Sequence, residues 1–184
     1  MSVSDLIAKI KSKDPAVRCA AWQEADQLGA EALGPLAAVM ADPGADLEVA
    51  LAAKHAMWTI VHHALAPGAA ASQQPIVAGL VNLLGAENQP VMVRSEVLWM
   101  LSEIGGDESV DPIAKLLADG QLREAARCAL ERIPGKKSSA ALRRALESGP
   151  ADFKPALAQS LRARGETVEG VPPFKAAPVY KTAS

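Results

Sequence analysis

A block of helical sequence recurs five times in register along this 184-residue chain. Each block places apolar residues at a first position and then four, eight and eleven residues later, except that the last block ends in Arg164. At about 100° per residue, these four offsets fall on one face of an α-helix. The first positions of the five blocks are Val17, Val49, Val93, Leu122 and Phe153. Repeats of this length predict a stacked helical array, in which each unit buries its apolar face against its neighbours.

A shorter apolar segment precedes each block and predicts a second helix for each repeat. In the fourth repeat this segment covers residues 110–117, and turn-forming residues such as the Asp-Pro-Gly at 42–44 separate the helices of a pair. The expected fold class is therefore all-α, with about five helix pairs in a repeat domain of residues 1–165. Residues 166–184 contain three prolines and no helical period, so we expect an extended C-terminal tail there.

The repeats are unevenly spaced. Their blocks begin 32, 44, 29 and 31 residues apart, so the second step contains an insertion. The alanine-rich composition places this insertion around residues 64–72, although that stretch also permits another register.

Two segments resemble short HEAT repeats in the style shared with phycobilisome-lyase proteins. Residues 104–119 look like the first helix of such a repeat, and residues 14–21 are similar to the opening of its second helix. A basic residue that the family carries in the second helix has counterparts in Arg18, Arg94, Arg123 and Lys154, whereas the second repeat has Ala50 there. The resemblance covers roughly residues 2–165. It implies an α-α superhelix, a HEAT-like solenoid, whose second helices line a concave face.

The helix face opposite each apolar stripe supplies the candidate binding residues. Large aromatic side chains bury much area with few rotatable bonds, so they suit an anchor for a partner. The candidates for this apolar anchor are Trp22, Leu51, His55, Trp58, His62, Leu98 and Trp99. The candidates for steering an acidic partner are Arg94, Arg123, Arg127 and the basic fifth repeat. We therefore expect a non-catalytic scaffold or adaptor that holds another protein, through an acidic or apolar segment, on the concave face.

The same aromatic positions also suit roles other than partner binding. The insertion, the tail or a second copy of the chain would cover these side chains, and ordinary packing between repeats would also use them. The tail in particular is expected to cover the groove until a partner displaces it.

Little in the sequence points to catalysis or to metal binding. His55 and His62 are seven residues apart, about 10.5 Å along a helix, whereas a chelating pair needs a spacing of three or four. The carboxylates of Asp107, Glu108 and Asp111 begin a predicted helix, where they complement the helix dipole. We expect no metal, no cofactor and no enzymatic activity.

Charge is distributed unevenly along the chain. Residues 1–121 carry 7 basic and 15 acidic side chains, a net charge of −8, whereas residues 122–165 carry 10 and 4, a net charge of +6. The basic end could contact phosphates, as in HEAT-like arrays that bind DNA and excise alkylated bases. The tryptophans lie in the acidic part instead, which argues against nucleic acid. The family resemblance implies a further alternative, a lyase-like or chaperone subunit that handles a tetrapyrrole chromophore.

Two cysteines, Cys19 and Cys128, are three repeats apart and therefore too distant for a disulfide. Free thiols, the absence of a signal peptide and the absence of an apolar run near 18 residues predict a cytoplasmic protein without a membrane segment. The identity of the partner and the oligomeric state stay open.

Overall fold

The computed structural model describes residues 1–86 and 88–173, and the regular secondary structure of these residues is entirely helical. The α-helices are α1 (Val3–Ile10), α2 (Pro15–Gln23), α3 (Leu33–Ala41), α4 (Leu47–Ala64), α5 (Ala70–Gly85), α6 (Val91–Ile104), α7 (Asp107–Lys115), α8 (Arg123–Arg132), α9 (Lys136–Ser148) and α10 (Lys154–Ala163). Two 3-10 segments, η1 (Ala25–Ala32) and η2 (Leu116–Ala118), lead into α3 and follow α7. The all-α prediction is confirmed.

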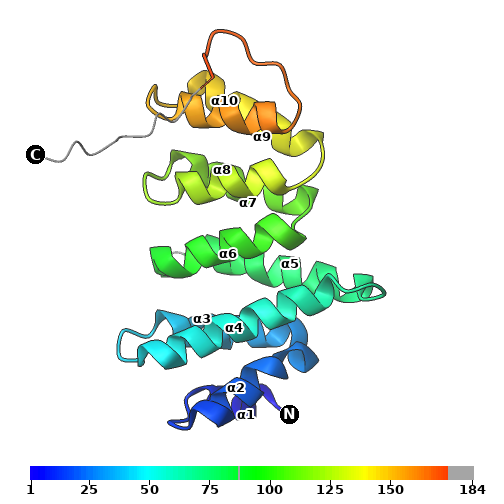
Figure 1. Ribbon diagram of the computed structural model, residues 1–184, viewed down its shortest axis with the longest axis vertical. Coiled ribbons are helices and arrows are strands. Elements are labelled where there is room, and N and C mark those ends of the chain that lie inside the picture. The colour runs from blue at the N-terminus through cyan, green and yellow to red at the C-terminus, as the bar shows by residue number, and fades with distance from the viewer. Residues whose placement is uncertain (87, 174–184) are drawn as a thin grey trace, which may run out of the picture.

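The helices follow one another in chain order along an elongated stack (Figure 1). Each even-numbered helix packs against the helix that precedes it in the chain. The even-numbered helices also contact one another in sequence, from α2 through α10, and the odd-numbered helices do the same from α1 through α9. The molecule therefore has two helical layers with the apolar side chains between them.

Local sequence signals explain several helix starts. The Asp14 carboxylate accepts a hydrogen bond from the backbone N–H of Ala16 at 2.8 Å, and Pro15 takes the first position of α2, where no N–H is needed. Ser2 and Asp5 form a capping box at α1. Asp119 accepts from the backbone N–H of Gln121 at 2.9 Å just before α8.

The apolar stripes of the second, third and fourth blocks form the core, since all their members are buried. Val17 departs from this pattern and is 36% exposed, because α2 is the outermost helix of its layer. The predicted insertion forms no long loop. It comprises the last residue of α4, a short turn over residues 65–69 and the first residues of α5. The ends of α4 and α5 project there beyond the rest of the stack (Figure 1).

Arg164, the residue that breaks the fifth stripe, has a structural role of its own. Its guanidinium donates hydrogen bonds to the backbone carbonyls of Leu130, Glu131 and Ile133 at the end of α8, at 3.0, 2.7 and 2.7 Å. It also donates to the carbonyl of Gly135 at 2.6 Å. These carbonyls have no partner within the helix, so Arg164 caps the helix of the preceding repeat.

Residues 166–173 contain no helix and pack against the last helix pair. Arg143 pairs with Glu166, and the guanidinium of Arg162 donates to the carbonyls of Val168 and Val171. This part of the predicted tail therefore lies over α9 and α10, away from the tryptophans. The remainder, 174–184, lies outside the described residues, and so does any contact it makes with the groove.

Candidate protein-binding surface

The aromatic candidates gather on the layer formed by α2, α4 and α6. The ring centroids of Trp22 in α2 and His55 in α4 are 5.3 Å apart. Within α4, Trp58 and His62 are about one helical turn apart, and the centroids of their rings lie 5.1 Å from each other. Trp22, Leu51 and His55 line a shallow cavity of about 260 Å³ between α2 and α4. The predicted aromatic residues of the first two repeats thus form a continuous surface.

Trp58 is half-buried and takes part in a polar bridge between α4 and α6. Its indole Nε1 donates to Glu96 Oε2 at 3.3 Å, and the other carboxylate oxygen of Glu96 lies 2.5 Å from Lys54 Nζ. Sequence reasoning missed Lys54 and Glu96. The two residues are 42 positions apart, and only the alignment of two helices across the insertion brings them together.

Trp99 is the most accessible of the three tryptophans, with 39% of its surface exposed. It lies on α6 together with two other exposed apolar side chains, Val91 and Met92 at the start of the helix. Leu51 on α4 is exposed to a similar extent, at 36%. This combination gives the layer an apolar surface that the protein itself leaves uncovered.

The prediction for Leu98 is corrected by the structure. Its side chain is fully buried, so it is unavailable as an anchor for a partner. Leu98 directly follows Val97 of the apolar stripe, and α6 is covered by α5 on one side and by α8 on another. These two neighbours bury a wider sector of α6 than the four-residue stripe predicts.

All three steering arginines bind other parts of the chain. Arg94 Nε donates to the carbonyl of Leu84 at the end of α5, at 3.2 Å. Arg123 Nη2 lies 2.7 Å from a carboxylate oxygen of Asp152, and its guanidinium lies 4.8 Å from the centre of the Phe153 ring. Arg94 also lies 3.9 Å from a carboxylate oxygen of Asp119 in the next repeat, so both arginines bind within the chain rather than extend toward the aromatic surface.

Arg127 is held by a polar network between α8 and α10. Its guanidinium donates to Glu124 at 2.9 Å, to Glu131 at 3.0 Å and to the buried Ser160 hydroxyl at 2.6 Å. Burial acts against the charge of Arg127, but the hydrogen bond to Glu124 and the nearby acidic groups outweigh it, so the pKa of the guanidinium is raised. Burial raises the pKa of the adjacent Cys128 thiol above its ordinary value.

The remaining histidine, cysteine and acidic side chains in the described ranges do not gather into a further site. No group of three or more His, Cys, Asp or Glu residues suited to a metal ion occurs there. His63 Nδ1 lies 3.1 Å from Asp26 as a single pair. Cys19 and Cys128 are both free thiols. None of the helices described is long and apolar enough to cross a membrane.

Comparison with known proteins provides little beyond the geometry. No family model matches the chain, and no curated protein matches it. A solved structure that it resembles is the crystal structure of an engineered protein, at 21% sequence identity and a TM-score of 0.41. That match covers 89% of this chain and 79% of the engineered one. At this level of similarity the match carries no conclusion about function.

Proposed function

We propose that this chain is a HEAT-like superhelical array that acts as a non-catalytic, cytoplasmic adaptor and binds another protein on the aromatic surface of α2, α4 and α6. The observation that carries the proposal is the grouping of all three tryptophans on one helical layer, where Trp99 keeps 39% of its surface exposed. A partner that inserts an apolar segment between these rings would bury a large area without ordering many flexible side chains.

Preorganisation supports the same proposal. Trp22 packs against His55, and the indole of Trp58 donates a hydrogen bond to Glu96. Side chains that already hold one conformation lose little entropy when a partner binds. The aromatic surface therefore favours binding of a preformed apolar anchor, such as one face of an amphipathic helix.

Charge would act on a partner at long range rather than through direct contacts of the three steering arginines. Arg94, Arg123 and Arg127 are engaged within the chain. The net charge of +6 over residues 122–165 nevertheless attracts an acidic partner at long range. We therefore assign affinity to the aromatic surface and the rate of association to the basic end.

The experiment is affinity capture from a host lysate, followed by titration of the captured protein against purified variants. A double variant, Leu51→Asp with Trp99→Asp, places charges on two exposed positions of the surface and leaves the core intact. The matched control is Leu65→Asp, because Leu65 is 38% exposed but lies just past the C-terminal end of α4. We expect the double variant to weaken binding by about tenfold or more and the control to bind like the wild type. Equal binding by all three proteins would refute the assignment.

A further inference from the structure

A second apolar depression lies at a different place, on the edge of the stack where turns join the helices of each pair. It has a volume of about 370 Å³ and is bounded by the ends of α7 and α9 and the starts of α8 and α10. Its apolar wall includes Leu117, Ala145 and Phe153, and its cationic side chains are Arg123 and Arg144. We refer to this depression as the Arg144 pocket.

The two arginines of the Arg144 pocket differ in the contacts that they make within the chain. Arg123 is paired with Asp152 and stacked on Phe153. In α9, Lys137 and Arg143 each form a salt bridge. Arg144 is exposed and forms no salt bridge with any other residue that the structure describes. The guanidinium of Arg144 is therefore available to a carboxylate of another molecule, and it lies next to the apolar wall of the pocket. The pocket suits a segment that combines an apolar side chain with flanking acidic groups.

The chain itself presents such a segment. Leu47 is 72% exposed, the highest value among the large apolar side chains described, and it lies between Asp46 and Glu48 at the start of α4. Acidic residues at a helix start are explained by the helix dipole, but the dipole gives no reason for an exposed leucine between them. We refer to these three residues as the Leu47 knob.

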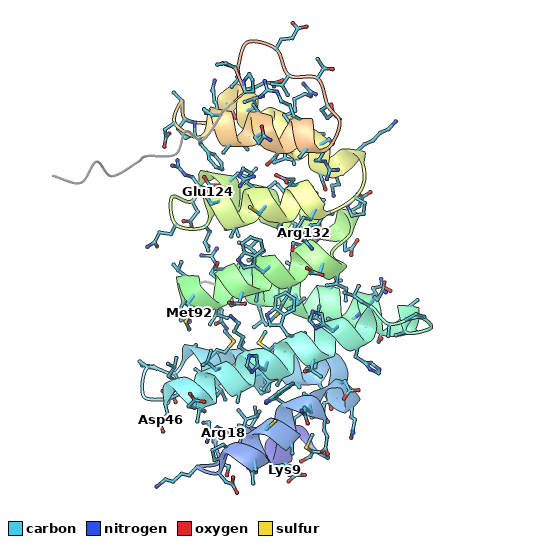
Figure 2. All side chains as sticks on the ribbon, in the orientation of Figure 1. Lys9, Arg18, Asp46, Met92, Glu124 and Arg132 are labelled. Atoms are coloured by element: carbon cyan, nitrogen blue, oxygen red, sulfur yellow. The ribbon has the colours of Figure 1, made fainter. Side chains whose placement is uncertain are left out.

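The Leu47 knob and the Arg144 pocket lie on the same edge of the molecule. Figure 2 labels Asp46, Met92 and Glu124 along this edge, at the starts of α4, α6 and α8. Asp46 belongs to the knob, and Glu124 directly follows Arg123 of the pocket. Two copies placed edge to edge in antiparallel orientation would therefore align each knob with the pocket of the other copy.

We propose that the chain forms a two-fold symmetric dimer in which the Leu47 knob of each copy occupies the Arg144 pocket of the other. Leu47 would then be covered by the apolar wall, while the acidic side chains of Asp46 and Glu48 would lie beside the exposed guanidinium of Arg144. The arrangement is closed, because a two-fold axis repeats the same contact twice and leaves no knob or pocket unused. It goes beyond the adaptor function and uses residues other than the three tryptophans.

The test is sedimentation velocity of the full chain from about 1 to 200 µM, the range in which weak dimers dissociate. The wild type should be a dimer at the upper end of this range. Leu47→Ser and Arg144→Glu should each raise the dimer dissociation constant by about tenfold or more, because each variant loses both reciprocal contacts. The matched controls Leu65→Ser and Lys136→Glu change exposed residues elsewhere and should dimerise like the wild type.

Mixing the two interface variants provides the decisive measurement. A copy with Leu47→Ser retains its pocket, and a copy with Arg144→Glu retains its knob, so a mixture restores one of the two contacts. We expect the mixture to associate more tightly than either variant alone. A monomeric wild type, a dimer insensitive to both substitutions, or a mixture no tighter than its components would overturn the proposal. Species larger than a dimer would overturn the two-fold arrangement. The wild type and all four variants are compared by circular dichroism to establish that they fold.

Discussion

Replacing Arg164 with leucine distinguishes a capping role for this residue from a simple break in the apolar pattern. In the other four blocks the equivalent position is apolar: Leu28, Ile60, Ile104 and Ile133. The stripe alone therefore predicts that Arg164→Leu restores the pattern and stabilises the protein. The structure predicts the opposite, because the arginine caps the end of α8 and its removal leaves those carbonyls without a donor.

The size of the effect follows from the hydrogen bonds of the guanidinium. Arg164 donates to four backbone carbonyls at 2.6–3.0 Å and to the Ser139 hydroxyl at 2.9 Å. A single hydrogen bond to a charged group contributes about 1.5–3 kcal/mol. The five bonds share one half-buried side chain and some carbonyls will be rehydrated, so we expect a total loss of about 2–3 kcal/mol for Arg164→Leu.

Urea unfolding followed by far-UV circular dichroism measures this loss. Fluorescence is less suitable, because the three tryptophans all lie before residue 100. Arg132→Leu is the control, since that arginine is 53% exposed and forms its salt bridge with the exposed Glu103. The control should change stability by less than about 1 kcal/mol. A variant Arg164→Leu as stable as the wild type would refute the capping role.

Three further predictions concern the core, the α4–α6 junction and the response to acid. Leu98→Ala should destabilise the protein by about 2–4 kcal/mol in urea, because the side chain is fully buried; a change below about 1 kcal/mol would contradict that burial. Glu96→Ala should cost about 1 kcal/mol and be non-additive with Lys54→Ala in a double-mutant cycle, because the pair is partly buried; additive effects would show that the two side chains do not interact. Stability should fall as the pH drops below the ordinary aspartate pKa of 3.8, because the hydrogen bond from Arg123 lowers the pKa of Asp152 in the folded state and its contribution is lost as that group protonates. Asp152→Asn should reduce this acid-induced loss in urea titrations at about pH 7 and pH 3, and an unchanged loss would exclude the pair as a cause.

The helices themselves were predictable because their signals are local. Asp14, which precedes Pro15 in the sequence, caps α2 through its side chain, an interaction between neighbouring residues. The buried stripes of α4, α6 and α8 follow from a period that needs no knowledge of neighbouring helices. A pattern of apolar residues within one helix therefore predicted which face of that helix is buried.

The contacts between repeats were not predictable in the same way. Leu98 is buried because α6 has neighbours on two sides, and the sequence of α6 does not specify how wide a sector those neighbours cover. Arg164 breaks the apolar pattern because its partners are carbonyls of the preceding repeat, and backbone carbonyls have no signature in the sequence. Binding residues depend on these contacts between repeats, so the candidate surface was predicted less well than the fold.

The junction of α4 and α6 joins the two longest helices of the layer that carries the tryptophans. α4 has 18 residues and α6 has 14, whereas α2 has 9 and α8 has 10. The two longer helices are joined by the polar bridge of Lys54, Glu96 and Trp58. The surface that we propose for binding therefore combines a polar bridge between these two long helices with the exposed ring of Trp99.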